Sequence, residues 1–394
     1  MTMLTLDLDL DSTLPTDGTA GTLIGRAWVP DAGGPSPVAL VGDQVIDVSG
    51  AFATVSDLGE QADPATALSE VTGVSIGSIA EVIANTPPAT RDSSRPWLLS
   101  PVDLQTLKAS GVTFAVSMIE RVIEERVRGN MEAAASMREE ILTEIGADLT
   151  RVKPNTVEAE ALKKYLVARD LWSQYLEVGL GPDAEIFTKG PTMSSMGTGV
   201  PVGYLSASAW NNPEPEAVIA VASTGRIWGG MLGNDVNLRD IEGRSALLLG
   251  RAKDNNASCA LGPFIRVFDS TFSLEDMRTL SISLEIDGED GFHLEGSSEM
   301  SQISRDPEDL VAQLLGEHHQ YPDGAVLMLG TMFAPVTDRD VVGSGFTHHR
   351  GDVVRISAGQ LGSLVNHVEE SERCEPWEFG IVSMMRNLAG RNLL

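Results

Sequence analysis

Cysteine, basic residues and long apolar runs are all scarce in this chain of 394 residues. The two cysteines, Cys259 and Cys374, are too few for a disulfide framework or a thiolate zinc site, and such low usage is typical of a reducing compartment. No run approaches the roughly 18 uninterrupted apolar residues of a membrane span, and the opening MTMLTLDLDLD carries acids where a signal peptide carries basic residues. We therefore expect a cytoplasmic protein with no membrane partner.

Positive charge is half as common as negative charge, since 28 Lys and Arg stand against 56 Asp and Glu, for a net charge of −28. Such a surface repels phosphate backbones, so we expect no nucleic-acid partner. Solubility or salt adaptation explains the acidity without a functional role. The hydrophobic fraction of 42% is ordinary for a globular protein, and the length exceeds the ~250 to 300 residues at which a single core stops growing.

Short β-prone stretches and helical periodicity alternate along the chain. Residues 23–58 are apolar stretches broken by Gly, Pro and Asp, which is typical of β-hairpins. The pattern from about 101 to 179 predicts helices, on apolar residues spaced three and four apart: Val112, Val116, Ile119, Val122 and Ile123. A second helix is expected from about Thr156 to Leu180, with Asn155 as N-cap and Glu158 completing a capping box.

The alternation of β-prone stretches with helical periodicity predicts an α+β protein. We expect a small N-terminal β-rich domain over residues 1–95, a helical connector over 96–179, and a C-terminal domain over 180–394 in which short strands return. A hinge should lie near 85–100, where ANTPPATRDSSRPW concentrates Pro, Ser and Thr.

Residues 213–240 are the most informative stretch, because two apolar strands flank Ser223-Thr224-Gly225 as in a hairpin. A turn centred on Thr224-Gly225 places Glu214 opposite Asp235, with their Cβ atoms about 5 Å apart. Glu216 then lies on the same face, one diagonal away at about 7 Å. Three carboxylates therefore converge at one end of the predicted hairpin.

A hard divalent cation is the natural partner for these three acids, because without one they repel each other. Three oxygen ligands leave about three octahedral positions for water or substrate, which suits Mg²⁺ or Mn²⁺ in a catalytic role. A solvated strand face is the alternative for the Glu214/Glu216 pair alone, because an acid-x-acid pattern also occurs at Asp7/Asp9, Asp9/Asp11, Glu158/Glu160, Glu285/Asp287, Asp287/Glu289 and Asp338/Asp340.

Lysine is rare in the last 215 residues, where only Lys189 and Lys253 occur, each in Gly-rich, turn-prone surroundings. There, backbone N–H groups and a point cation can hold an anion, so both are candidate substrate-binding residues. An ordinary surface charge is the alternative for either lysine. The Gly-, Ser- and Thr-rich segment from Glu185 to Thr198 has the composition of a lid loop, and we expect Lys189 at its entrance.

Several motifs in this order resemble the fumarylacetoacetate hydrolase superfamily. They are Glu214-x-Glu216, GNDVNLRD with Asp235, Lys253 before LGPF, GTMFAP at 330–335 and GDVVRISAGQLGSLVNHV at 351–368. The resemblance covers roughly residues 180–394. With GVTFAVS at 111–117 and the segment CEPWEFGIVSMMRNLAGRNLL, the whole chain is similar to the sugar-acid branch of that superfamily.

The resemblance implies a mixed β-roll catalytic domain, an N-terminal α/β domain, and Mg²⁺ held by Glu214, Glu216 and Asp235. It implies a hydro-lyase of pentose degradation that converts 2-keto-3-deoxy-D-xylonate, also called 2-keto-3-deoxy-D-arabinonate, into 2-oxoglutarate semialdehyde. Lys253 would face the substrate and hold the enolate or donate a proton. A homodimer or homotetramer is expected.

The same resemblance assigns further roles. Glu185 matches the lid acid of the dehydratases and is the candidate for acid–base work, while Gly330 and Thr331 would bind the substrate carboxylate and Ser117 would border the pocket. A plain structural serine is the alternative for Ser117. One departure is Asn237, where many relatives carry Ser in this motif.

The positions of the histidines in the sequence distinguish the hydrolases of the superfamily from the dehydratases. The hydrolases of the superfamily activate water with a His–Glu pair ahead of the metal acids, whereas all six histidines here follow Asp235: His293, His318, His319, His348, His349 and His367. This favours a lyase. The alternatives are a fumarylacetoacetate- or acylpyruvate-type hydrolase, an oxaloacetate decarboxylase, and a non-catalytic ligand-binding protein of the same fold. A zinc site at the paired histidines is not expected, because adjacent side chains diverge.

Overall fold

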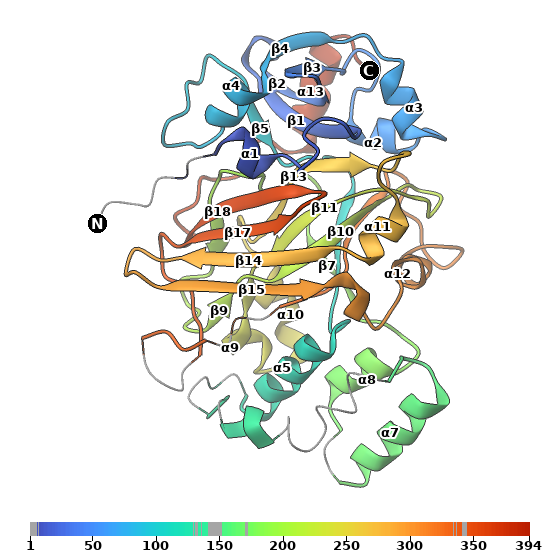
Figure 1. Cartoon of the computed structure of the whole chain (residues 1–394), viewed down its shortest axis with the longest axis vertical. Helices are drawn as coiled ribbons and strands as arrows, with labels where there is room; N and C mark the ends of the chain where they lie inside the picture. The colour runs from blue at the N-terminus through green and yellow to red at the C-terminus, as the bar shows by residue number, and fades with distance from the viewer. Residues whose placement is uncertain are drawn as a thin grey trace.

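The protein is arranged in three tiers (Figure 1). The computed structural model describes residues 6, 8–128, 130, 133–134, 136–140, 152–169, 172–333, 335, 337–340 and 345–394. N-terminal strands form the upper tier, the larger part of the sheets forms the middle tier, and helices α5 (Ala115–Arg126), α7 (Val157–Val167) and α8 (Gln174–Leu180) form the lower tier. Within the described residues, no helix combines the length and apolar character needed to cross a membrane.

An 11-stranded sheet runs through the upper and middle tiers in the order β4-β3-β2-β1-β13-β11-β10-β16-β6-β7, with β5 pairing on β1. Its strands are β1 (Leu23–Val29), β2 (Gly34–Val41), β3 (Gln44–Asp47), β4 (Val74–Ser78), β5 (Trp97–Leu99), β6 (Thr106–Ser110), β7 (Ile186–Gly190), β10 (Pro215–Val221), β11 (Ile227–Asp235), β13 (Cys259–Val267) and β16 (Ala325–Met328). Most neighbours are antiparallel, but β16 and β6 run parallel.

A five-stranded sheet in the order β15-β14-β17-β18-β8 covers one side of the middle tier. Its strands are β8 (Val202–Tyr204), β14 (Ser281–Asp287), β15 (His293–Glu299), β17 (Val353–Ala358) and β18 (Gly362–Glu370). A two-stranded ribbon joins β9 (Asn211–Asn212) to β12 (Asn237–Leu238).

The spacing of apolar residues along each strand matches how much of the strand is buried. The strands β10 and β13 read PEAVIAV and CALGPFIRV, and every residue in them is buried because both of their faces are covered. The strand β14, SISLEID, alternates exposed and buried residues, as a strand with one face in water does. The main core lies between the two sheets and includes Ile219, Leu232 and Leu284.

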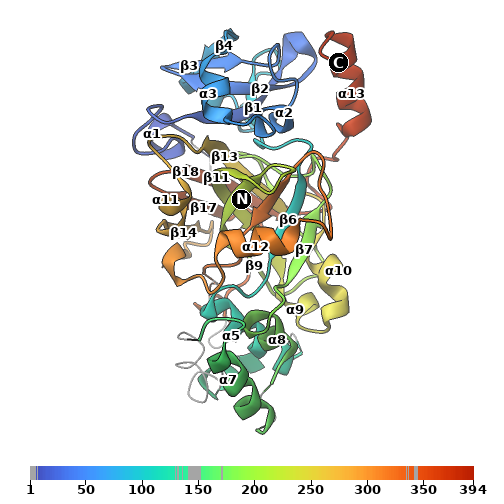
Figure 2. The same cartoon turned by 90° about the vertical axis from the view of Figure 1, so that its right-hand side faces the viewer.

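Short helices connect and flank the strands. They are α1 (Leu10–Thr13), α2 (Val55–Gly59), α3 (Pro64–Ser69), α4 (Ile79–Ala84), α9 (Arg239–Glu242), α10 (Leu249–Lys253), α11 (Leu274–Arg278), α12 (Pro307–Leu314) and α13 (Ile381–Gly390). The last of these returns to the upper tier and lies beside the N-terminal strands (Figure 2). There the Asn387 side chain donates to the Ala32 carbonyl at 2.8 Å, and Arg391 donates to Ser49 Oγ at 2.7 Å.

The predicted α+β class is confirmed, but the helical interpretation of residues 101–179 needs correction. Its first part is the strand β6, and the helix begins only at Ala115, so Val112 lies outside it. Val116 is 48% exposed rather than buried. The apolar spacing is real for Ile119 and Val122, which face the core of the lower tier.

The helix expected over 156–180 is two helices, α7 and α8. Thr156, not Asn155, is the N-cap of α7, because its hydroxyl accepts a hydrogen bond from the Ala159 N–H at 3.2 Å. Asn155 adopts a left-handed conformation with φ of 56°. Ser173 caps α8, which packs on α5. Most of the helical run expected at 131–146 lies outside the described residues.

The sheet continues across the predicted domain boundaries, since β1 pairs with β13 and β6 pairs with β16. Whether residues 1–95 fold as a unit of their own stays a prediction.

Candidate active site

The hairpin of β10 and β11 has the register predicted from the sequence. Pro215 faces Asn234, and Glu216 faces Gly233. The Asp235 N–H donates to the Glu214 carbonyl at 3.0 Å, so these two acids lie opposite each other where the strands end. Near the turn the register shifts by one residue at a bulge after Ala220.

Glu214, Glu216 and Asp235 converge in the interior. Each offers a carboxylate oxygen within 4.8 Å of the others, and each side chain is about 1% exposed. Three buried hard oxygen donors are the ligand set that Mg²⁺ prefers in proteins, so these residues fit a divalent cation. A sheet face solvated by water, the alternative for this motif, does not describe side chains so deeply buried.

Protein cations surround two of the three acids. The Lys253 ammonium lies 2.5 Å from Glu214 Oε2 and 3.0 Å from Asp235 Oδ2, and the Lys189 ammonium lies 2.7 Å from Asp235 Oδ1. The Arg121 guanidinium binds Glu214 Oε1. Glu216 instead accepts a hydrogen bond from the Gly330 N–H at 2.7 Å.

The acids differ accordingly in their pKa values. Burial, together with the negative charges of Asp235 and Glu214, raises the pKa of Glu216 well above its usual range. Burial acts in the same direction on Asp235, but the ammonium groups of Lys189 and Lys253 outweigh it, and the pKa of that carboxyl is lowered. The neutral form is thus favoured for Glu216 and the carboxylate form for Asp235, so these two acids repel each other less than two carboxylates would.

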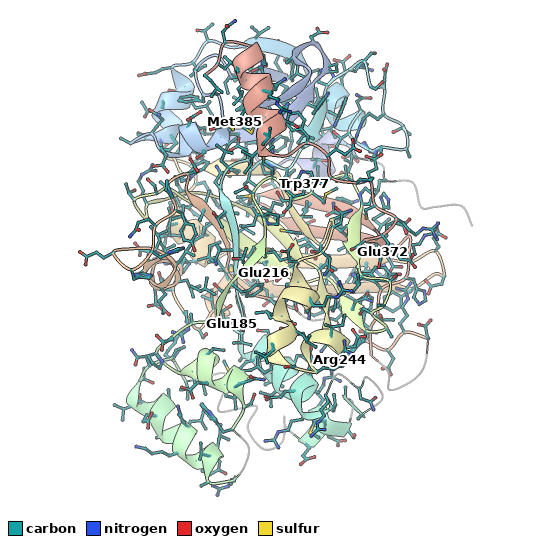
Figure 3. The ribbon with its side chains drawn as sticks, turned by 180° about the vertical axis from the view of Figure 1, so that it is seen from behind. Glu185, Glu216, Arg244, Glu372, Trp377 and Met385 are labelled. Atoms are coloured by element: carbon teal, nitrogen blue, oxygen red, sulfur yellow. The ribbon has the colours of Figure 1, made fainter. Side chains whose placement is uncertain are left out.

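A narrow hollow of about 10 Å³ lies over these acids and brings most of the predicted site residues together. Its lining includes the three acids and Ser117, Glu185, Lys253 and Thr331. Figure 3 shows Glu216 in the middle tier and Glu185 nearer to the helices of the lower tier. The hollow therefore lies where the sheets meet those helices.

Glu185 precedes β7, and the residue is half-buried. Its carbonyl accepts a hydrogen bond from the Gly111 N–H at 3.0 Å, and a Cβ atom at residue 111 would come within 1.9 Å of Glu185 Oε2. Burial raises the pKa of Glu185, although the cations Arg121 and Lys253 act against the shift. A carboxyl group that gains and loses its proton closer to neutral pH is suited to acid–base work.

Gly330 and Thr331 follow β16. Gly330 has a φ of 106°, and a Cβ atom there would lie 1.9 Å from Thr113 Oγ1, so only glycine lets the backbone N–H reach Glu216. Thr331 is 7% exposed and lines the hollow. Ser117 also lines it, although its hydroxyl donates to the Phe114 carbonyl at 2.9 Å.

Lys189 does not border an entrance, as we expected from the sequence. It is 1% exposed and lies behind Asp235, where its ammonium also donates to the Lys253 carbonyl at 2.5 Å. The lid interpretation of residues 185–198 is also wrong for its first half, because 186–190 form a strand paired with β6. Met193, farther along, is buried.

Two charged lining residues were missed from the sequence, Arg121 and Glu242. Arg121 follows Ser117 by one turn of α5, so the two side chains share a helix face. That spacing is the signal that could have found Arg121. Glu242 ends α9, directly after the GNDVNLRD motif, and its carboxylate lies 3.1 Å from the Arg121 guanidinium.

No histidine lines the hollow among the described residues. The paired histidines diverge as expected, since His348 is 4% exposed whereas His349 lies at the surface beside Asp340, at 2.9 Å. Water activation by histidine therefore has no candidate within the described lining.

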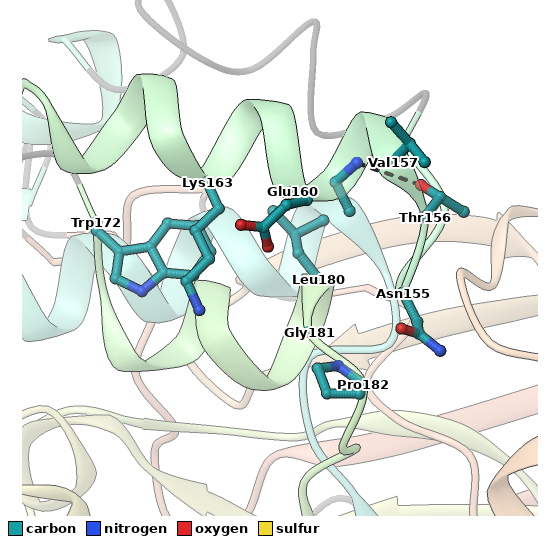
Figure 4. A pocket seen from close by; sticks show the side chains of 10 residues that line it. Asn155, Thr156, Val157, Glu160, Lys163, Trp172, Leu180, Gly181 and Pro182 are labelled. Atoms are coloured by element: carbon teal, nitrogen blue, oxygen red, sulfur yellow. Dashed lines mark hydrogen bonds between the residues drawn. The ribbon is translucent and has the colours of Figure 1, made fainter.

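A larger hollow of about 390 Å³ lies between α7 and α8 (Figure 4). Its cation, Lys163, is 2.5 Å from Glu177 and lies over the Trp172 ring at 5.1 Å. Because its lining has no cluster of buried acids, we place the candidate active site at the smaller hollow.

Residues 217–369 match the fumarylacetoacetate (FAA) hydrolase C-terminal family. The chain therefore carries the fold of that family in its middle tier, and the resemblance predicted from the sequence is confirmed. Glu214 and Glu216 lie just before the matched segment, whereas Asp235 and Lys253 lie within it.

The named relatives that this chain resembles are dehydratases. The 2-dehydro-3-deoxy-D-arabinonate dehydratase of Saccharolobus solfataricus is 30% identical over 189 residues, 48% of this chain and 60% of that protein. The probable 2-keto-3-deoxyxylonate dehydratase of Haloferax volcanii is 30% identical over 194 residues, 49% of this chain and 63% of that protein. This chain thus covers less than two thirds of either relative.

A solved structure, 2-keto-3-deoxy-D-arabinonate dehydratase complexed with magnesium and 2,5-dioxopentanoate, is similar to this chain with a TM-score of 0.60 at 21% identity. The similarity covers 89% of this chain and 99% of that chain. At this identity the likeness establishes the fold.

Proposed function

We propose that the protein is a metal-dependent dehydratase that converts 2-keto-3-deoxy-D-xylonate into 2-oxoglutarate semialdehyde. The observation that carries the proposal is the hollow itself, in which three buried acids, a lysine and a carboxyl group of raised pKa meet without a histidine. The names of the two relatives support the same reaction class. The cytoplasmic location and a homodimer or homotetramer stay predictions.

Glu214, Glu216 and Asp235 would hold the metal, with Mg²⁺ as the first candidate and Mn²⁺ as a second. When bound, the ion supplies a Lewis acid that makes the C3 protons of a chelated 2-keto acid more acidic. Against the effect of burial, the ammonium groups of Lys189 and Lys253 lower the pKa of Asp235, which favours the carboxylate form that binds metals.

Glu185 would carry the proton work. As a carboxylate it would take a proton from C3, and as a carboxylic acid it would return a proton to the C4 hydroxyl, which leaves as water. Transfer of a proton from C5 to C3 then gives an enol, and its tautomer is the aldehyde. Lys253 would stabilise negative charge at the substrate oxygen during these steps. Thr331 and Ser117 would orient the substrate in the hollow.

The test is incubation of the purified protein and Mg²⁺ with a panel of 2-keto-3-deoxy sugar acids, with detection of the semialdehyde. Chelator treatment should abolish its formation, and added Mg²⁺ should restore it. Glu185→Gln should retain Mg²⁺ binding yet lose roughly 10²-fold or more in turnover.

Acylpyruvates and oxaloacetate test the alternatives in the same assay. Efficient acylpyruvate cleavage would indicate a hydrolase, carbon dioxide release from oxaloacetate would indicate a decarboxylase, and ligand binding without turnover would indicate a non-catalytic protein. Any of these results without dehydration would overturn the proposal.

A further inference from the structure

Both oxygens of Glu214 are engaged by protein cations, Oε1 by Arg121 and Oε2 by Lys253. A metal ion held by Glu214 needs at least one of these oxygens. A carboxylate oxygen can accept a hydrogen bond and bind a metal at once, but a cation beside the bound ion is repelled by it. We therefore expect one of the two cations to yield its place, and the surroundings of each indicate which one can do so.

Lys253 has poor alternatives. Its ammonium contacts Glu214 and Asp235, both of which belong to the same three acids, and it is 3% exposed. Moving it away from these acids leaves a buried ammonium without an ion-pair partner, which is strongly unfavourable.

Arg121 has alternatives already in place. Its Nη1 atom lies 2.5 Å from Glu124 Oε2 and 3.1 Å from Glu242 Oε2, while Nη2 is the atom that reaches Glu214. The guanidinium can therefore release Glu214 and still keep two buried acidic partners, Glu124 and Glu242.

An anionic substrate needs such a cation. The hollow contains five acids against two cations, namely Glu185, Glu214, Glu216, Asp235 and Glu242 against Arg121 and Lys253. The whole molecule, with these residues included, has a net charge of −28. A carboxylate that enters the hollow gains most from a guanidinium donor that is no longer committed to Glu214.

We propose that Arg121 exchanges partners, serving as the counter-ion of Glu214 in the metal-free protein and as the receptor of the substrate carboxylate once a divalent ion is bound. The inference rests on the proposed function for the nature of the substrate, a 2-keto acid. Arg121 thus couples the two binding events, because it leaves Glu214 at the moment when the substrate requires it.

The first experiment is a calorimetric titration of metal-free protein with Mg²⁺, without substrate. Removing a competing cation should raise the affinity, so Arg121→Gln should bind Mg²⁺ roughly 10-fold more tightly than the unaltered protein. The matched control is Arg239→Gln. Arg239 lies in the same buried network, 2.6 Å from Glu124 and 2.5 Å from Glu120, but contacts none of the three acids. Its Mg²⁺ affinity should stay within about two-fold of the unaltered protein.

The second titration adds pyruvate, as the smallest 2-keto acid, to the Mg²⁺-loaded proteins. Arg121→Gln should bind pyruvate roughly 10-fold or more weakly, although its metal site is tighter. A merely structural residue weakens both ligands together, so opposite changes in the two affinities are the signature of the exchange. Arg121→Lys keeps the charge and is the safer variant for folding. Its affinity for each ligand should lie between those of the unaltered protein and Arg121→Gln.

Equal or weaker Mg²⁺ binding by both the Gln and Lys variants would overturn the inference. If Arg121→Gln does not fold, a crystal structure of the unaltered protein with Mg²⁺ decides, since the guanidinium should no longer contact Glu214. These readouts require no turnover. Absence of dehydration with opposite affinity changes would therefore refute the proposed reaction and leave the exchange standing.

Discussion

Glu214, Glu216 and Asp235 carry the same functional group but have different partners. Glu214 and Asp235 each contact two protein cations, whereas Glu216 accepts a backbone N–H, and its pKa is raised by burial and by its two neighbours. Glutamine therefore imitates Glu216 in the metal-free protein but not Glu214.

Glu216→Gln should change the free energy of unfolding of the metal-free protein by less than about 1 kcal/mol, because it replaces a protonated carboxyl with another neutral group. Glu214→Gln should cost about 3 to 5 kcal/mol, because Arg121 and Lys253 lose their buried counter-ion. Urea unfolding measures both. Glu216→Gln should nevertheless weaken Mg²⁺ binding by roughly 100-fold, and equal destabilisation by the two variants would contradict this assignment of charge.

Glu242 makes the stability of the metal-free protein depend on pH. Burial raises its pKa to about 7 from a usual value of 4.5, with Arg121 acting against the shift. The folded state therefore holds a proton that the unfolded chain has lost, and stability falls by about 1.4 kcal/mol per pH unit as the pH rises from about 4.5 to 7. Across this range, the free energy of unfolding should depend less steeply on pH for Glu242→Gln than for the unaltered protein. An unchanged slope would show that Glu242 is ionised when folded.

Gly111 sets the position of the Glu185 carboxylate. Alanine there would place a Cβ atom 1.9 Å from Glu185 Oε2, so Gly111→Ala should displace the carboxylate and lower turnover by roughly 10²-fold without loss of fold. Gly250→Ala is the control, because a Cβ atom at Gly250 meets nothing within 4 Å in α10. Turnover by Gly111→Ala equal to that of the control would remove Glu185 from the chemistry.

At the scale of elements, the hairpin was predictable and the helices were less so. The register of β10 and β11 follows from one turn and the period of two, both of which are local properties of the sequence. The strand β6 reads TLKAS, and only its position between β16 and β7 makes it a strand. The place of Lys189 behind Asp235 also depends on contacts between distant segments.

The same contrast applies to the site. Motif order singled out the three acids and Lys253. The acids lie on or directly beside the neighbouring strands β10 and β11, and Lys253 ends α10, which follows these strands in the chain. Arg121 comes from α5, 93 residues from Glu214, and it was missed because helical periodicity indicates which face is buried but not which ion pairs form there.

The beginning of α7 gives a prediction for one element. Thr156→Ala should destabilise the helix by about 1 kcal/mol, because Thr156 is its N-cap. Asn155→Gly should be neutral or slightly stabilising, since Asn155 has a φ of 56° and glycine adopts this conformation without strain. Hydrogen exchange of the α7 amides measures both effects. A larger destabilisation of α7 by Asn155→Gly than by Thr156→Ala would indicate that Asn155 is the N-cap.

At the scale of the whole molecule, the net charge of −28 opposes folding through mutual repulsion of surface acids. Raising NaCl from about 0.1 M to about 1 M should therefore increase the free energy of unfolding by about 1 to 2 kcal/mol, or a few degrees in Tm. Sucrose at matched osmolarity is the control for general exclusion from the surface. A Tm that falls with NaCl would show that favourable ion pairs outweigh the repulsion.

The contact between α13 and the N-terminal strands can form only after the ribosome has synthesised α13. Ala32 and Asn387, which share a hydrogen bond, are 355 residues apart in the chain. A ribosome adds about 5 to 20 residues per second, so the first strands wait for tens of seconds before the helix that covers them exists. During that interval their uncovered surface is open to chaperones and to neighbouring nascent chains, so slower translation before α13 should lower the yield of folded protein.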